Sequence, residues 1–303
     1  MSATATRTMR AVVLARPGAA HAREVPLPEP CDEEVLVRLE GCGVCASSLP
    51  LWEGRPWFAY PAEPGAPGHE AWGVEVESGR RVALLSYRGY SEYETVPASA
   101  TVPLPPELED VPFPGEAIGC ALNVFARSGI ACGDTVGVVG AGFLGLLLVQ
   151  LAARAGARVL AFSRRETALA LARSFGAETP AELEDECCDV AIEAAGVQQT
   201  LDLAARLPRV RGRLVLAGFH QDGPRTVDLQ SWNWRGLDIV NAHERDDGVR
   251  LEGIRAAAAG VAEGRLDPSP LYTHVLPLER TAEAFELART RPEGFVKALV
   301  SCR

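Results

Sequence analysis

The stretch that decides the fold reads VGVV (residues 136–139), GAGFLG (140–145) and LLLVQLAARA (146–155). The first part is a short apolar run typical of a strand, and the last is an apolar run typical of a helix. The spacing GxGxxG lies between them. A strand before this spacing and a helix after it are the context that predicts a dinucleotide-binding turn.

Each glycine of this turn has a distinct expected role. Gly140 allows the tight turn, Gly142 lets a pyrophosphate approach the backbone, and Gly145 lets helix and strand pack closely. The N–H groups at the start of the helix, where Phe143 and Leu144 lie, attract an anion. The alternative is that the glycines serve packing only.

A second strand is predicted over residues 158–162, and its end indicates which cofactor binds. An NAD site usually carries Asp or Glu here for the ribose 2′-hydroxyl, but this chain has Ser163, Arg164 and Arg165. The serine can hydrogen-bond a 2′-phosphate and the arginines can neutralise it. NADP(H) is therefore favoured over NAD(H). The alternative is two solvated arginines that open the next helix.

Outward from this unit, the chain changes character near Gly115. Downstream, strands are predicted over residues 189–193, 213–217 and 238–241, with helical segments between some of them, which is typical of a parallel sheet covered on both faces. Ala195 and Gly218 follow two of these strands, where a cofactor crosses the sheet. Upstream, short alternating runs separated by turn residues, among them residues 74–76 and 90–96, predict an all-β domain. The last strand is expected over residues 297–301.

Composition limits the function classes. The length of 303 residues favours two domains, because one domain usually takes about 150 residues. A net charge of −10 makes a nucleic acid partner a poor expectation, and no apolar run predicts a membrane span or a secretory signal. Eight cysteines without a signal peptide suggest reduced thiols in a cytoplasmic protein. Lys297 is the only lysine, so a catalytic lysine is not expected.

Two segments of the β region carry metal-ligand residue types. The first, GCGVCASSL (residues 41–49), contains Cys42 and Cys45, and the second, PGHEAWG (67–73), contains His69. Alone, the two cysteines fit a redox pair or half of a zinc ribbon. Without further context, Cys45 reads as a buried thiol and His69 as a loop histidine.

Together with the glycine-rich turn, these segments resemble the medium-chain dehydrogenase/reductase family, in its zinc-dependent alcohol and polyol dehydrogenase branch. The matching segments are GVCASS (43–48), PGHE (67–70), GRRV (79–82) and PLERTAEAFE (277–286). The resemblance covers nearly the whole chain. It implies an α/β protein with a GroES-like β-barrel catalytic domain over residues 1–116 and 267–303, and a Rossmann doubly wound parallel-sheet domain over 117–266.

The resemblance also implies the site residues. Cys45 and His69 are expected as ligands of a catalytic zinc, and Glu70 as an adjacent carboxylate that coordinates or exchanges with water. The third ligand is expected at Glu116, with Cys120, about one helical turn later, as the alternative. Such a set leaves the fourth position open, as in catalytic zinc sites.

Ser47 is expected to accept or return the proton of the alcohol, and its alternative role is to form a turn. Three departures from the family are visible. Ser48 replaces a carboxylate, Pro50 replaces a relay histidine, and the four cysteines of a structural zinc are absent after GRRV (79–82). One zinc per chain is therefore predicted.

The sequence thus predicts a zinc-dependent NAD(P)(H) oxidoreductase. It would interconvert a polar secondary alcohol and its ketone, or an aldehyde and alcohol pair, by hydride transfer. The polar segment NAHERD (241–246) favours a polar substrate, unless it is only a solvated loop. A homodimer or homotetramer is implied by the family. The alternatives are a zinc-free medium-chain reductase of the quinone or enoyl type, and a non-catalytic dinucleotide-binding sensor or structural protein.

Overall fold

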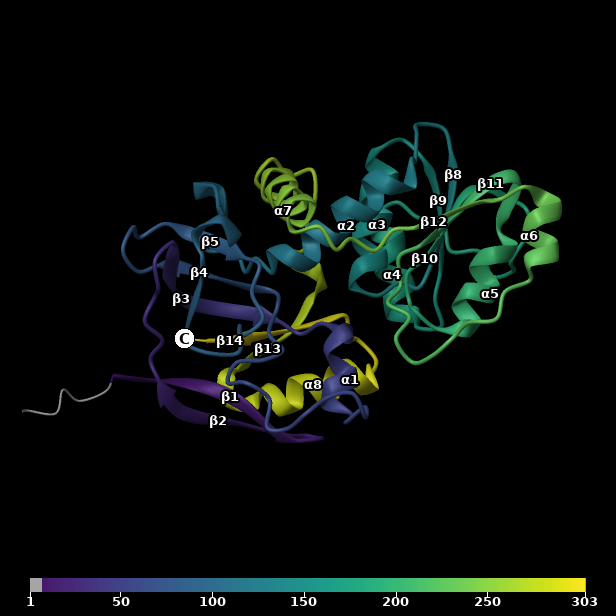
Figure 1. Ribbon diagram of the computed structural model, residues 1–303. Coiled ribbons are helices and arrows are strands. Elements are labelled where there is room, and N and C mark those ends of the chain that lie inside the picture. Colours follow the sequence, from purple (N-terminus) through teal and green to yellow (C-terminus); the bar gives the residue numbers. More distant parts are fainter. Residues whose placement is uncertain (1–6, 303) are drawn as a thin grey trace, which may run out of the picture. The chain divides into compact units, whose positions relative to one another are not determined.

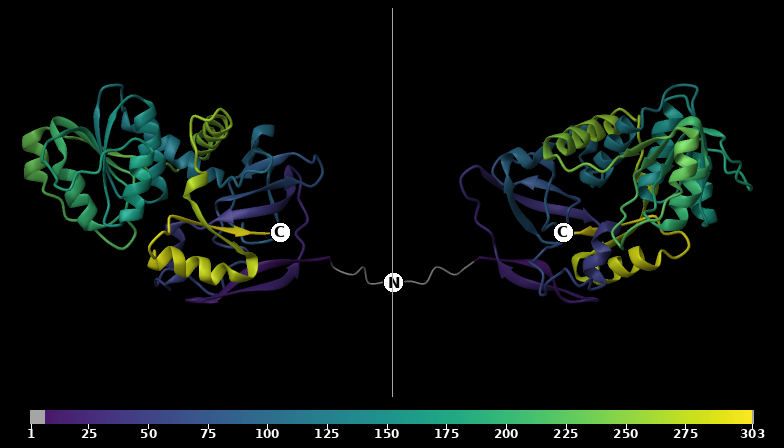
Figure 2. Two further views of the ribbon diagram at one scale, coloured as in Figure 1. Left: turned by 180° about the vertical axis from the view of Figure 1, so that it is seen from behind. Right: turned by 45° about the vertical axis from the view of Figure 1, so that its right-hand side comes forward.

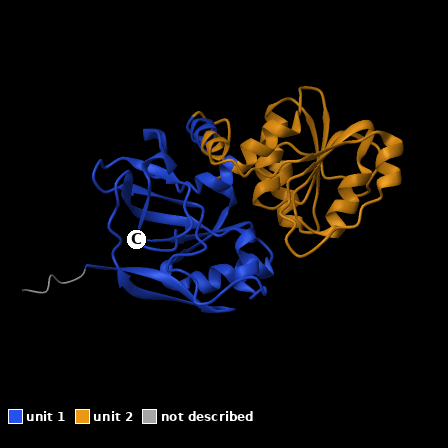
Figure 3. Cartoon of the chain, viewed as in Figure 1, with its two compact units in different colours: residues 1–119, 254–262, 269–303 blue, residues 120–253, 263–268 orange. Residues whose placement is uncertain are grey.

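The computed structural model describes residues 7–302. Two compact units are distinguished by their internal contacts: residues 1–119, 254–262 and 269–303 form unit 1, and residues 120–253 and 263–268 form unit 2 (Figure 3). Unlike the predicted division, this grouping places 254–262 with unit 1 and so divides helix α7 (Asp247–Ala262). Residues 1–6 and 303, which the predicted catalytic domain includes, lie outside the described residues.

Unit 2 is built on a parallel sheet. Its strands are β8 (Thr135–Val139), β9 (Arg158–Phe162), β10 (Cys188–Glu193), β11 (Pro208–Leu216) and β12 (Asp238–Asn241), in the order β12-β11-β10-β8-β9. A single parallel bridge between Leu160 and Glu178 lies beyond β9 in the place of a further strand. The order then matches the dinucleotide-binding arrangement 3-2-1-4-5-6, whose direction reverses between β8 and β10.

Helices cover both faces of this sheet. Figures 1 and 2 show α3 (Phe143–Arg154) and α4 (Glu166–Ser174) on one face, with α5 (Gln198–Arg206) and α6 (Leu229–Arg235) on the other. The inner strands are apolar where both of their faces are buried, as in β8, where four of five residues are buried. The predicted doubly wound sheet is therefore present.

Unit 1 contains a mixed sheet in which distant parts of the chain pair. Its order is β13 (Tyr272–Pro277), β14 (Lys297–Ser301), β3 (Glu34–Gly43), β4 (Ala71–Glu75), β5 (Arg81–Leu84) and β7 (Thr101–Pro103), and β6 (Tyr93–Pro97) also pairs with β3. The antiparallel pair β14 and β3 joins the C-terminal segment to the N-terminal strands, with Val300 opposite Cys42. The C-terminal segment thus completes the β domain, as predicted.

The remaining elements of unit 1 enclose its core. They are the hairpin of β1 (Thr8–Arg16) and β2 (Ala19–Pro26), the short α1 (Leu49–Trp52), α8 (Thr281–Thr290) and the first turn of α2 (Gly115–Ser128), which crosses into unit 2. Trp52 stacks on Phe285 of α8 with ring centroids 5.1 Å apart, and Tyr90 meets the same ring edge-on. These rings anchor α1 and α8 to the sheet that carries the candidate site.

Several predicted boundaries need correction. The strand expected over residues 90–96 is β6 (Tyr93–Pro97), because Tyr90 is fully buried in the core and donates its hydroxyl hydrogen to the carbonyl of Gly43. The strand expected over 74–76 is β4 (Ala71–Glu75), whose first three residues are all buried and show no alternation. Among the described residues, no helix is both long and apolar enough to span a membrane.

Candidate functional site

Three candidate metal ligands converge where β3 ends and its neighbour β4 begins, in the sheet of unit 1. Cys45 follows β3, whereas His69 and Glu70 precede β4, and these antiparallel neighbours align Cys42 with Ala71. The end of β3 therefore meets the start of β4. As a result, one sulfur, one ring nitrogen and one carboxylate oxygen lie within 4.8 Å of one another.

The ring of His69 is oriented for binding. Its Nδ1 lies 2.9 Å from the carbonyl oxygen of Pro67, so Nδ1 carries a hydrogen and donates it, and Nε2 becomes the acceptor whenever the ring is neutral. A backbone partner of this kind holds metal-binding histidines in one tautomer. Burial lowers the pKa of His69, but the negative charges of Cys45, Glu116 and Glu70 outweigh it and raise the pKa to about 10. The same charges would stabilise a bound cation.

Ser47 lies directly against two of these groups. Its hydroxyl donates to Sγ of Cys45 at 3.1 Å, and Oγ is 3.3 Å from Nε2 of His69. The short 3-10 turn Ala46–Ser48 begins just after Cys45 and directs the hydroxyl back toward the thiol. Of the predicted site residues, Ser47, Cys45, His69 and Glu70 are therefore brought together.

Glu70 has a partner that sequence reasoning missed. Nζ of Lys297 lies 2.7 Å from Oε1 and 2.5 Å from Oε2 of this fully buried carboxylate. Burial lowers the pKa of Lys297, but Glu70, Cys45 and Glu116 raise it above its ordinary value, so the ammonium stays charged. A Cβ on Gly43 would lie 1.8 Å from Oε2 of Glu70, so only glycine admits the carboxylate at this point.

Glu116 and Cys120 lie on the same helix, α2. Glu116 is in its first turn, and its charge raises the pKa of both His69 and Lys297, so it is within electrostatic reach of the cluster. Cys120 is exposed. A thiol, an imidazole and carboxylates are the donor types that zinc takes in proteins, so the residues present fit a zinc ion.

The glycine-rich turn of unit 2 has the geometry that its sequence predicts. Gly140 has φ +106°, which only glycine adopts readily, and a Cβ on Gly145 would lie 1.9 Å from the carbonyl oxygen of Gly140. Gly142 is the N-cap of α3, and a Cβ there would meet nothing within 4 Å. The open space at Gly142 thus leaves room for a ligand to approach the backbone at the start of α3, where Phe143 and Leu144 follow.

The residues expected near a 2′-phosphate lie at the end of β9. The backbone N–H of Arg165 donates to Oγ of Ser163 at 3.2 Å, and its guanidinium is 3.5 Å from the carbonyl oxygen of Ala141. Arg165 therefore reaches the glycine-rich turn. Arg164 is exposed at the same corner.

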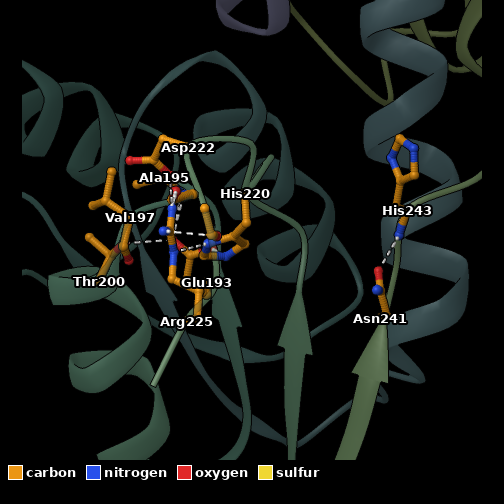
Figure 4. Close-up of polar contacts among 11 residues, drawn as sticks. Glu193, Ala195, Val197, Thr200, His220, Asp222, Arg225, Asn241 and His243 are labelled. Atoms are coloured by element: carbon orange, nitrogen blue, oxygen red, sulfur yellow. Dashed lines mark hydrogen bonds and ion pairs between the residues drawn. The ribbon is translucent and has the colours of Figure 1, made fainter. Parts of the chain in front are cut away.

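The other two cofactor candidates lie in turns at neighbouring strand ends. Ala195 follows β10 and Gly218 follows β11. Both turns contact the buried carboxylate of Glu193, which sequence reasoning did not single out. Beyond β12, the ring of His243 lies 5.9 Å from that of Phe219, centroid to centroid, and its backbone N–H donates to the side-chain oxygen of Asn241 (Figure 4).

Comparison with known proteins gives the same assignment. A family model for zinc-binding dehydrogenases matches residues 144–246. Sorbitol dehydrogenase of Gallus gallus is 28% identical over 98% of this chain and 98% of its own length. A Sinorhizobium meliloti protein described as a zinc-binding dehydrogenase, with NADP bound, superposes with a TM-score of 0.84 at 28% identity, covering 97% of this chain and 99% of that one. The chain thus resembles the medium-chain dehydrogenase/reductase family over nearly its whole length, and the family model itself covers residues 144–246.

Two further proteins of known type are similar over most of this chain. L-threonine 3-dehydrogenase of Bacillus velezensis is 25% identical over 88% of this chain and 91% of its own length. Alcohol dehydrogenase of Thermus sp. ATN1 superposes with a TM-score of 0.80 at 27% identity, covering 97% of this chain and 100% of that one. The predicted fold class, a β domain plus a Rossmann domain, is confirmed.

Proposed function

We propose that this protein is a zinc-dependent, NADP(H)-preferring oxidoreductase that interconverts a polar secondary alcohol and its ketone by hydride transfer. The observation that carries the proposal is the convergence of thiol, imidazole and carboxylate donors at Cys45, His69 and Glu70 within 4.8 Å. The relatives named as sorbitol and L-threonine dehydrogenases support a polar substrate. The polar segment at residues 241–246 supports it as well.

In this proposal, one zinc is held by Cys45, His69 and Glu116. Glu116 is preferred to Cys120 because it acts electrostatically on His69, whereas the thiol is exposed. Glu70 lies close enough to join or leave the ligand set, and Lys297 neutralises it when it does not bind metal. Bound zinc would acidify the alcohol as a Lewis acid, and the bound nicotinamide would accept the hydride.

In this scheme Ser47 relays the proton of the alcohol: its oxygen accepts that proton as its own hydroxyl hydrogen passes to water, which reaches this partly exposed side chain. Its hydroxyl already contacts the thiol and the imidazole that would hold the metal, so it could exchange a proton with a substrate alcohol bound beside them. Ser47→Ala is expected to lower kcat about a hundredfold with zinc content unchanged, because a positioned proton acceptor contributes 10²–10⁴-fold. Ser47→Thr keeps the hydroxyl and is expected to stay within about tenfold. Unchanged kcat in the alanine variant would assign Ser47 to the turn alone.

Two alternative functions, a zinc-free reductase and a non-catalytic sensor, can be tested against this proposal. The thiol, imidazole and carboxylate gathered at one point argue against a zinc-free reductase, which needs no metal ligands. The Ser47 hydroxyl in contact with this cluster argues against a non-catalytic sensor, which needs no proton relay. The zinc content of the purified protein, measured by elemental analysis, tests the zinc-free alternative: about one zinc per chain is expected, and less than half would exclude the zinc mechanism.

A broad panel of alcohols and ketones, followed by NAD(P)H absorbance, tests the non-catalytic alternative. No absorbance change with any of them, while cofactor still binds, would exclude catalysis. The cytoplasmic location stays a prediction.

We further propose that the protein is a homodimer joined through unit 2. The strand β12 lies at an edge of the described sheet. The helix α6, which packs on the neighbouring strand β11, carries Trp234, which is 88% exposed, and Leu229, which is 66% exposed. Exposed apolar residues and an open strand edge are both typical of a surface covered by a partner, and a two-fold axis would pair β12 with its copy.

Trp234→Glu is therefore expected to shift the mass measured by light scattering from dimer to monomer, because it places two charges in the interface. Val76→Glu is the matched control, since Val76 is 54% exposed but lies in unit 1. A wild-type protein that is monomeric at every concentration would contradict the proposal.

A further inference from the structure

The carboxylate of Glu193 is fully buried, and the proposed chemistry does not use it. It lies at the carboxyl end of β10, next to the point where the strand order reverses. Its Oε1 accepts the backbone N–H groups of Ala195 and Gly196, both at 2.8 Å, and the hydroxyl of Thr200 at 2.6 Å. Its Oε2 lies 3.0 Å from Nε2 of His220 (Figure 4). A buried charge with this many donors is part of a built network.

His220 connects the carboxylate to Arg225. Nε of Arg225 donates to Nδ1 of His220 at 2.9 Å, so Nδ1 is an acceptor and the ring hydrogen must be on Nε2, which donates to Glu193. The same guanidinium donates to the carbonyl oxygen of Gly196 at 2.8 Å and pairs with Asp222. The network therefore ties the loop that follows β11 to the turn that follows β10.

The two turns leave no room for other side chains. A Cβ on Gly218 would lie 2.3 Å from Oε2 of Glu193, and a Cβ on Gly196 would lie 2.6 Å from the carbonyl oxygen of Phe219. A Cβ on Gly140 would lie 3.0 Å from that of Ala195. The turns after β8, β10 and β11 thus pack backbone against backbone, and the network holds the last two of them.

We propose that Glu193, His220 and Arg225 are positioning residues that hold the turns at residues 194–197 and 217–220 in the conformation that binds the nicotinamide half of the cofactor. The inference rests on the proposed function. In this sheet order a dinucleotide crosses at the reversal point, with one half over β8 and β9 and the other over β10 to β12. The network lies at the ends of β10 and β11, on the side of the sheet order that takes the nicotinamide half. Its polar atoms are directed at the backbone, so it acts on the cofactor through the turns.

Glu193→Gln separates the two sets of contacts that the carboxylate makes: those of Oε1 with the turn after β10, and that of Oε2 with His220. The amide oxygen can still accept from Ala195, Gly196 and Thr200, so the turn after β10 is kept. The amide nitrogen would face Nε2 of His220 as a second donor, and the ring cannot change tautomer without opposing the donor of Arg225. Arg225→Ala removes the donor to Nδ1 of His220. Arg225→Lys keeps the positive charge but loses the planar guanidinium, which reaches both His220 and the carbonyl oxygen of Gly196.

The test measures binding of NADPH, NADH and the adenine fragments 2′,5′-ADP and 5′-AMP by calorimetry. Both Glu193→Gln and Arg225→Ala are expected to weaken the preferred dinucleotide about tenfold and to leave the fragments unchanged, because hydrogen bonds to charged groups contribute on this scale. With substrate saturating, KM for the dinucleotide should rise while kcat falls less than about threefold. Arg225→Lys should resemble Arg225→Ala.

Arg206→Ala is the matched control, because Arg206 pairs with Asp185 at the exposed end of α5. Equal weakening of dinucleotide and fragment would indicate general damage to unit 2 and overturn the positioning role, as would unchanged dinucleotide binding in both variants. A wild-type protein that binds neither NADPH nor NADH would instead refute the proposed function itself.

Discussion

Replacing Cys45 with alanine is expected to abolish zinc binding and to lower kcat/KM about a thousandfold. In the proposed site the thiol is one of three protein donors, and the metal that it would help to hold would contribute several kcal/mol of charge stabilisation, at about 1.4 kcal/mol per tenfold in rate. Zinc per chain is measured by elemental analysis, and turnover is measured on the same sample. Cys31→Ala is the matched control, since Cys31 is an exposed thiol outside the cluster.

The same pair of measurements identifies the third ligand. Glu116→Ala is expected to lose zinc as Cys45→Ala does, whereas Cys120→Ala should keep both metal and activity. The opposite pattern would move the ligand to Cys120. Full zinc content and full activity in Cys45→Ala would contradict the proposed metal site altogether.

Replacing Arg164 and Arg165 together with alanine is expected to weaken NADPH binding about a hundredfold and NADH binding less than about threefold. Each guanidinium would lose a charge-assisted contact to the 2′-phosphate, which NADH lacks, and such contacts contribute roughly tenfold or more apiece. Dissociation constants from fluorescence titration provide the measurement. Arg173→Ala is the control, because Arg173 lies at the far end of α4 and pairs with Glu166. Equal losses for both cofactors would refute the 2′-phosphate assignment.

The Rossmann part of the fold was readable because its signals are local. The strands β9 and β12 have the predicted bounds, and β8 has the predicted end. The conformation of the glycine-rich turn follows from Gly140 and Gly145 within the turn itself. In the β domain, β4 began three residues before its prediction. The first residue of β4 is set by its pairing with β3, and a local sequence pattern does not reveal such a long-range contact.

The candidate site was only partly visible in the sequence. The motifs around Cys45 and His69 are short and distinct, and the antiparallel pairing of β3 with β4 explains why they meet. Lys297 gave no signal, because its partner Glu70 is 227 positions away in the chain. Glu193 was equally silent, since a lone acidic residue at a strand end is common, and only its buried partners reveal a network.

The most direct test of the account is hydride transfer that depends on zinc. Oxidation of a panel of polyols and secondary alcohols is followed by NADPH and NADH absorbance, with protein that is zinc-loaded, stripped by a chelator and then reloaded. The account predicts turnover of at least one polar secondary alcohol that disappears on stripping and returns with zinc. Equal turnover in the stripped protein, or none in the loaded protein while cofactor is bound, would contradict it.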